Sequence, residues 1–253
     1  MTLNSYISGL GFYVPPNVVT NDDLSKIMDT SHEWIYERTG IKERRFVDEG
    51  KGIGSADLAV PACEKAIQMS GLPKSKIDLI VFATSMPDYF IPGSSCILQE
   101  LLGLETVGAL DVRVQCSGFV YGLSIADQYI KSGMYKNILV VGAEVQSTSM
   151  DLSDRGRNVS VIFADGAGAA VVSSTNQNRG ILSTHLHSEG KFLKDLWLES
   201  PASKHSPSIT AQDLEDGKQY LQMNGREVFK HAVKRFEEVI MEGLSFNSFE
   251  VSN

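Results

Sequence analysis

Apolar residues along the chain follow two spacings, and these spacings predict strands and helices that alternate. Continuous apolar runs bounded by turn residues predict buried strands, whereas recurrence every three to four positions predicts amphipathic helices. This alternation indicates an α/β protein with a mostly parallel sheet. The predicted strands are 6–12, 77–84, 107–114, 137–142 and 180–187, and the predicted helices are 24–28, 34–40, 55–70, 94–102, 119–130 and 225–243.

The second part of the chain repeats features of the first. The segment 180–187 resembles 6–12, and the helix predicted at 225–243 corresponds to the helix at 55–70. After the first of these helices a buried strand begins at Ile77, whereas the corresponding position after the second is Phe249, close to the last residue. A sheet that stopped there would expose strand edges. We therefore expect two similar halves, 1–176 and 177–253, with the second half truncated in this chain.

Composition and charge exclude several classes of protein. The 253 residues include 31 acidic and 23 basic side chains, and this net charge of −8 argues against nucleic-acid binding. No two of the three cysteines form a CxxC motif, so neither a disulfide framework nor a metal site is expected. No apolar run approaches membrane-spanning length, and the N-terminus lacks the pattern of a signal peptide. We expect a cytoplasmic protein without a membrane segment.

Cys116 is the candidate nucleophile because it lies where a strand pattern changes into a helix pattern. The apolar run 107–114 ends just before it, and helical spacing begins at Phe119. The first turn of a helix has unpaired N–H groups and the positive end of the helix dipole, which favours a thiolate. Ser117 and Gly118 are small, so another molecule can approach the sulfur. The alternative, a buried structural cysteine, fits these neighbours less well.

Two other segments carry residues that suit ligands or partners. Trp34 is followed by Lys42, Arg44 and Arg45, which is compatible with a solvated loop anchored by one indole. The same residues could instead bind a nucleotide, with the indole stacking and guanidinium groups on phosphate. The loop 85–93 carries three apolar residues between prolines, which indicates contact with a partner or a pocket.

The Gly/Ala run at 164–172 lacks a complete GxGxxG motif, and its glycines fall within or just before a predicted strand. A dinucleotide site is therefore not expected there. The helix at 225–243 has a different feature, a basic stripe of Arg226, Lys230 and Lys234 opposite its apolar face. This stripe could dock an acidic protein, or it could be a solvated face balanced by neighbouring glutamates.

Six segments in order along the chain resemble the β-ketoacyl-acyl-carrier-protein synthase III family, the condensing enzymes that initiate type II fatty-acid synthesis. The resemblance implies a thiolase-like α/β fold, layered α-β-α-β-α, with two similar halves. It also implies a homodimer that uses acyl-CoA and malonyl-acyl-carrier protein and needs no cofactor. The segments are TSHEWIYERTGIKERR, DVRVQCSGFVYGLSIADQYIKSG, DRG at 154–156, FADGAGAAVV, GILSTHLHSEG and MNGREVFK.

The same resemblance implies roles for individual residues. Cys116 matches the nucleophile that takes a short acyl group from acyl-CoA. Trp34 and Arg155 match the residues around the CoA adenine, and Arg38 matches a phosphate contact. Ile91 matches a loop residue that reaches the acyl pocket of the partner subunit, although the adjacent Phe90 could take this position. The residues that match the lining of the pantetheine tunnel are Met223, Gly225 and Phe229.

The sequence departs from the family in one respect. The HQAN and GNTS motifs, which supply the catalytic histidine and asparagine of the family, do not occur in these 253 residues. None of the five histidines lies in such a motif, so we assign no catalytic histidine. We expect this chain alone to accept an acyl group without completing condensation. A related acyltransferase or ketosynthase of secondary metabolism and a non-catalytic partner subunit are the alternatives.

Overall fold

The computed structural model describes residues 3–251, and these residues form two compact units, each with its own core. The first unit contains residues up to 17, 45–145 and 165–184, and the second contains 18–44, 146–164 and the residues from 185 onward. This division groups the residues that pack against one another. The predicted halves, 1–176 and 177–253, describe an internal repeat, and that repeat stays a prediction.

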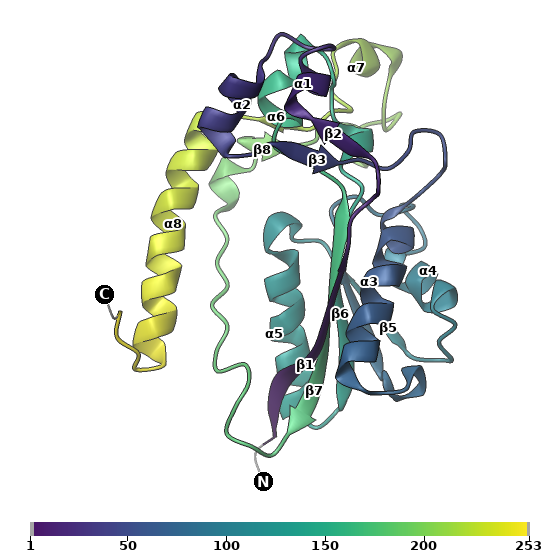
Figure 1. Cartoon of the computed structure of the whole chain (residues 1–253), viewed down its shortest axis with the longest axis vertical. Coiled ribbons are helices and arrows are strands. Elements are labelled where there is room, and N and C mark those ends of the chain that lie inside the picture. Colours follow the sequence, from purple (N-terminus) through teal and green to yellow (C-terminus); the bar gives the residue numbers. More distant parts are fainter. Residues whose placement is uncertain (1–2, 252–253) are drawn as a thin grey trace. The chain divides into compact units, whose positions relative to one another are not determined.

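The first unit is built on a mixed sheet whose strand order, within residues 3–251, is β1-β7-β6-β4-β5 (Figure 1). β6, β4 and β5 pair in parallel, whereas β7 lies between β1 and β6 and runs antiparallel to both. The predicted α/β class is therefore confirmed, but one reversed strand lies inside the sheet. The strands are β1 (Asn4–Tyr13), β4 (Leu79–Ala83), β5 (Gly108–Val112), β6 (Asn137–Glu144) and β7 (Gly166–Thr175).

Helices cover both faces of this sheet: α3 (Ser55–Ser70) and α4 (Ser94–Leu101) lie on one face, and α5 (Gly118–Lys131) lies on the other (Figure 1). Along β4, Ile80 and Phe82 belong to the core shared with α3, whereas Leu79 and Val81 belong to the core shared with α5. Successive side chains of a strand point to opposite faces, so a strand covered on both sides is apolar throughout. This confirms the doubly buried strand predicted at 77–84.

β1 packs closely against α3 because two glycines leave room for the helix backbone. A Cβ atom on Gly9 would lie 2.1 Å from the carbonyl oxygen of Ala66, and one on Gly11 would lie 2.1 Å from that of Ala62. On the other face, the Ser5 hydroxyl donates a 2.6 Å hydrogen bond to the buried Asp127 of α5. The strand is thus held between the two helix layers.

The second unit has short elements and one long helix. Its core contains Leu24, Met28, Ile35 and Val161. Within residues 3–251, no helix is both long and apolar enough to cross a membrane. The helices are α1 (Asn21–Leu24), α2 (His32–Thr39), α6 (Arg157–Ser160), α7 (Ala211–Glu215) and α8 (Gly225–Phe246), and the strand pairs are β2 (Val18–Thr20) with β3 (Glu43–Arg45) and β8 (Leu196–Trp197) with β9 (Gln222–Met223).

Short 3₁₀ turns connect elements in both units, and the turn η2 matters most because it contains Cys116. The turns are η1 (Lys74–Lys76), η2 (Gln115–Ser117), η3 (Ser147–Ser149), η4 (Asp154–Gly156) and η5 (Gly190–Phe192).

The predicted strand at 180–187 is wrong. This segment has no strand assignment, although the N–H of Ile181 donates a 2.9 Å hydrogen bond to the carbonyl of Ser5. Apolar alternation alone does not make a strand, because a strand also needs a partner to complete its ladder of hydrogen bonds. Ile181 instead packs into the core beneath α5.

Two smaller expectations also need correction. α1 begins at Asn21 and ends at Leu24, because a capping box formed by Thr20 and Asp23 starts the helix earlier than predicted. β5 is half-buried because it ends the described order of strands.

Candidate active site

Cys116 lies on an exposed turn that joins β5 to α5, as the sequence predicts. Gln115, the residue before it, has φ of 46°, a left-handed conformation that side chains other than glycine rarely adopt. Such strain is retained where the surrounding structure requires it, and it is frequent at functional sites. The turn therefore holds the exposed cysteine two residues before Gly118, the first residue of the helix.

Gly118 has a packing role that the sequence interpretation missed. A Cβ atom at this position would lie 2.8 Å from the Cβ of Ala83, at the end of β4. The glycine is buried and lets α5 begin in close contact with the sheet. Gly118 thus positions the helix N-terminus, whereas we expected it to clear space for a ligand.

Cys116 shares the carboxyl edge of the parallel strands with a half-buried hydrogen-bond network around Glu144. Thr84 follows β4, Glu144 ends β6 and Cys116 follows β5, and these three strands run in parallel. Ligands of open α/β sheets bind at this edge. Burial raises the pKa of Glu144, although hydrogen bonds from Ser85, Met86 and Thr84 act in the opposite direction. Glu144 was not predicted, and its only sequence signal is an acid at the end of an apolar strand.

The loop after Thr84 carries the apolar tip that the sequence indicated. Tyr89, Phe90 and Ile91 are 65%, 75% and 88% exposed. Large apolar side chains with this exposure commonly mark a surface that meets another molecule.

The indole of Trp34 lies in the second unit, on α2, which begins at the N-cap Ser31 and ends at Gly40. Two guanidinium groups lie against this ring: Cζ of Arg38 is 4.5 Å from its centroid and Cζ of Arg157 is 4.9 Å from it. Cations favour the faces of aromatic rings. The structure therefore brings Arg38 and Arg157 together at Trp34, and the phosphate contact implied for Arg38 stays a prediction.

Arg155 contacts a different set of groups. Its Nε donates to the carboxylate of Asp151, and one terminal nitrogen donates a 3.2 Å hydrogen bond to the carbonyl of Glu215. Its Cζ lies 5.8 Å from the ring of Tyr220. These contacts differ from those of Trp34, and the place of Arg155 at the CoA adenine stays a prediction. The second arginine of the Asp-Arg-Gly-Arg segment was the available signal for Arg157.

The residues assigned to a pantetheine tunnel lie at the start of α8. Met223 belongs to β9, and Gly225 is the first residue of the helix. A Cβ atom on Gly225 would lie 3.4 Å from the Cε of Met223, so these two residues are neighbours. Phe229, one turn further on, is 71% exposed. Their role in binding stays a prediction.

The basic stripe of α8 is exposed but partly paired. Nζ of Lys230 lies 3.5 Å from a carboxylate oxygen of Glu227, and Nζ of Lys234 lies 3.8 Å from one of Glu238. Arg226 is also exposed. Surface pairs of this kind contribute little to stability, and a docking role of the stripe stays a prediction.

Three histidines of the second unit contact side chains of neighbouring elements. Nδ1 of His185 lies 3.0 Å from one oxygen of Glu242 on α8, and Nε2 of His187 lies 2.6 Å from the other. The centroid of the His231 ring lies 4.0 Å from the centroid of the Phe192 ring. Within residues 3–251, no group of three or more potential metal ligands is present.

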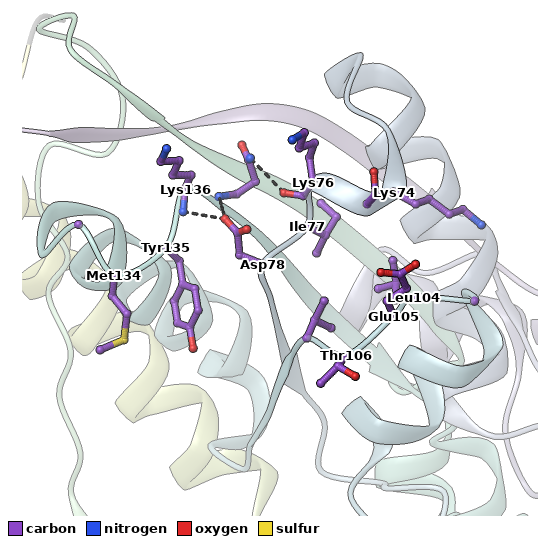
Figure 2. Close-up of a pocket in the computed structure, with 15 residues that line it drawn as sticks. Lys74, Lys76, Ile77, Asp78, Leu104, Glu105, Thr106, Met134, Tyr135 and Lys136 are labelled. Carbon is purple, nitrogen blue, oxygen red and sulfur yellow. Dashed lines mark hydrogen bonds between the residues drawn. The ribbon is translucent and has the colours of Figure 1, made fainter.

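The amino edge of the parallel strands, opposite the edge of Cys116, has a hollow of about 760 Å³. Figure 2 shows the residues that line it. It is lined by residues that precede β4, β5 and β6, including Lys74, Lys76 and Lys136. Asp78 is held there by the N–H groups of Lys136 and Asn137, at 2.8 and 2.9 Å. Because this is the amino edge of the parallel strands, it is not where such sheets bind their substrates.

Comparison with known proteins identifies the family. A family model described as 3-oxoacyl-[acyl-carrier-protein (ACP)] synthase III matches residues 110–190, which include the Cys116 turn. A β-ketoacyl-[acyl-carrier-protein] synthase III from Xanthomonas euvesicatoria pv. vesicatoria (strain 85-10) is 44% identical over 246 residues, or 97% of this chain and 73% of that protein. The chain belongs to this family.

Solved structures agree with this assignment to the synthase III family. The 3-oxoacyl-[acyl-carrier-protein] synthase III from Aquifex aeolicus VF5 has a TM-score of 0.83 and 41% identity, covering 97% of this chain and 73% of that one. The priming β-ketosynthase from the R1128 polyketide biosynthetic pathway has a TM-score of 0.77 and 31% identity, covering 91% of this chain and 66% of that one. The family resemblance and the thiolase-like α/β fold are confirmed.

Proposed function

We propose that this chain initiates fatty-acid synthesis as a synthase III, with Cys116 as the acyl acceptor. The thiolate Sγ attacks the thioester carbonyl carbon of acyl-CoA, the carbon–sulfur bond to CoA breaks, and CoA leaves as a thiolate that takes up a proton. The observation that carries this proposal is the exposed Cys116 on a strained turn directly before α5. Acyl-CoA is the substrate, and the transfer requires no cofactor.

The second step joins the acyl group to malonyl-acyl-carrier protein. Loss of carbon dioxide leaves an enolate, which attacks the acyl carbon and releases the Cys116 sulfur. Each neutral donor that stabilises such an oxyanion contributes about 2.7–4 kcal/mol to lowering the barrier. The HQAN and GNTS donors do not occur in these 253 residues, so we expect this chain alone to stop at the acyl-enzyme.

The CoA nucleotide is proposed to bind at Trp34. One face of the adenine stacks on the indole. The guanidinium groups of Arg38, Arg155 and Arg157 are available to bind the CoA phosphates or to cover the other face of the adenine. The two arginines that already contact the ring, Arg38 and Arg157, support this placement. Met223, Gly225 and Phe229 are proposed to line the path of the pantetheine arm.

Two partners belong to the proposal. The stripe of Arg226, Lys230 and Lys234 would dock the acidic carrier protein, since complementary charge steers such encounters. A second copy of this chain would form a homodimer in which Ile91 enters the acyl pocket of the partner. The 88% exposure of Ile91 supports a role in contact with another molecule.

A ketosynthase that primes polyketide synthesis is the second candidate function. The likeness to the R1128 priming ketosynthase favours it, because that structure shares the same fold at 31% identity. The exposed Cys116 argues against a non-catalytic subunit, which would have no need of a reactive thiol.

The first test is intact-mass measurement of the 253-residue chain after incubation with acetyl-CoA. We expect one acetyl group on the wild-type protein and on Cys96→Ser, and none on Cys116→Ser. Cys96 is the matched control because it is the other exposed cysteine. Addition of malonyl-acyl-carrier protein should yield no 3-ketoacyl product. Acetylation that persists in Cys116→Ser would refute the assignment of the nucleophile.

A further inference from the structure

The loop 85–93 has a firmly held base and an exposed tip. The tip consists of Tyr89, Phe90 and Ile91, each more than half exposed. At the base, the N–H of Thr84 donates a 3.3 Å hydrogen bond to the carbonyl of Val112, the last residue of β5. The tip therefore projects from a fixed point next to the strand that leads to Cys116.

Glu144 supplies the main anchor of this base. Its Oε1 accepts hydrogen bonds from the N–H and the hydroxyl of Ser85, at 2.7 and 3.0 Å. Its Oε2 accepts hydrogen bonds from the N–H of Met86 at 3.1 Å and from the hydroxyl of Thr84 at 3.2 Å. Both carboxylate oxygens are thus directed at three consecutive residues where the loop leaves β4.

Two further contacts hold the same loop. The hydroxyl of Ser55, at the start of α3, donates to the carbonyl of Met86 at 2.7 Å and accepts from the N–H of Val145 at 3.2 Å. The carboxylate of Asp88 accepts from the N–H of Ala56 at 3.1 Å, and the N–H of Asp88 donates to the hydroxyl of Ser94 at 3.2 Å. Only the tip beyond Asp88 is left without such anchors among the contacts of the described residues.

We propose that Glu144 is a positioning residue that sets the place of the Tyr89–Ile91 tip and thereby the choice of acyl group. This role rests on the proposed function, in which Ile91 enters the acyl pocket of a partner subunit. A carboxylate suits the role because every group facing it is a donor. An amide in its place would turn its NH₂ group toward a backbone N–H, which can only donate, and so would weaken one side of the anchor.

The test compares how fast acetyl-CoA and isobutyryl-CoA acylate Cys116. In Glu144→Gln we expect the ratio of the two rates to change by about tenfold, since hydrogen bonds to a charged group are among the stronger ones. Ser85→Ala, which removes one hydroxyl donor, should change the ratio in the same direction by less. Glu100→Gln, the same substitution at an exposed site on α4, should leave it unchanged.

A double-mutant cycle separates positioning from a general loss of stability. Ile91→Ala should change the ratio directly, and Glu144→Gln should then add little in the Ile91→Ala background. Fully additive effects, or an unchanged ratio in both Glu144→Gln and Ser85→Ala, would overturn the role of Glu144. Wild-type protein that no acyl-CoA acylates would overturn the proposed function itself, and with it any role in selectivity.

Discussion

The three cysteines lie in three different environments, and the environment decides their chemistry. Cys63 is fully buried in α3, where burial raises the pKa of its thiol. Cys96 is exposed on the regular helix α4. Cys116 is exposed on a turn that includes a left-handed residue and precedes a helix. A thiolate is the reactive form of cysteine, so buried Cys63 is the least suited to reaction.

Iodoacetamide should distinguish these environments. Under native conditions we expect alkylation of Cys116 and Cys96 but not of Cys63, measured by mass spectrometry of the digested peptides. Prior incubation with acetyl-CoA should protect Cys116, because its sulfur is then acylated, and should leave the labelling of Cys96 unchanged. Labelling of Cys63 at the rate of Cys116, or equal protection of both exposed cysteines, would contradict this.

Residue types alone did not identify which arginine contacts Trp34. The segment 154–157 contains two arginines, and residues two apart in a helical turn point to different sides. Arg157 contacts the indole and also donates a 2.6 Å hydrogen bond to the carbonyl of Asp29. Arg155 is held by Asp151. The sequence indicated a cation near Trp34, and the conformation of the backbone at 154–157 decides which arginine contacts the ring.

Elements with strong local signals were predicted to within a few residues. The helix predicted at 55–70 coincides with α3, which ends at Gly71 in the left-handed conformation. The helix predicted at 225–243 is present as α8 and extends to Phe246. The segment 180–187 failed because strand formation depends on a distant partner, which local apolar spacing does not report.

The close contact of β1 with α3 gives a prediction at the scale of elements. Gly11→Ala would place a methyl group 2.1 Å from the carbonyl oxygen of Ala62, so strand and helix must separate. We expect a loss of about 1–3 kcal/mol in the free energy of unfolding, measured by denaturant titration.

Gly168→Ala in β7 is the matched control for Gly11→Ala. Among the residues that the structure describes, no heavy atom beyond its chain neighbours lies within 4 Å of the added Cβ. Its effect should stay within about 0.5 kcal/mol, as for substitutions away from packed features. Equal losses for both variants would show that the spacing between β1 and α3 is not the cause.

At the scale of the whole molecule, charge is unevenly distributed. The chain carries a net charge of −8, yet basic side chains gather on one face of α8 and around the hollow of Figure 2. The proposed docking of an acidic carrier protein would use such a basic patch, and the attraction would weaken as salt screens the charges.

Charge reversal tests which basic patch receives the carrier protein. Lys230→Glu should weaken carrier-protein binding by about three- to tenfold at low salt and by less at high salt, measured as a dissociation constant. Lys136→Glu makes the same charge change at the amino edge of the sheet and should have a smaller effect. Equal weakening by both substitutions would indicate a response to net charge alone.

The sequence by itself determined the α/β class, the order of most helices and strands, the place of Cys116 and the family. These properties depend on local spacing, capping residues and motifs, all of which lie within short stretches of chain. The tertiary structure alone decided that β7 runs against its neighbours, that Arg157 reaches Trp34, and that Glu144 anchors the loop at 84–86. Each of these three features depends on contacts between residues that are far apart in the chain. Local patterns contain no information about which distant groups will meet.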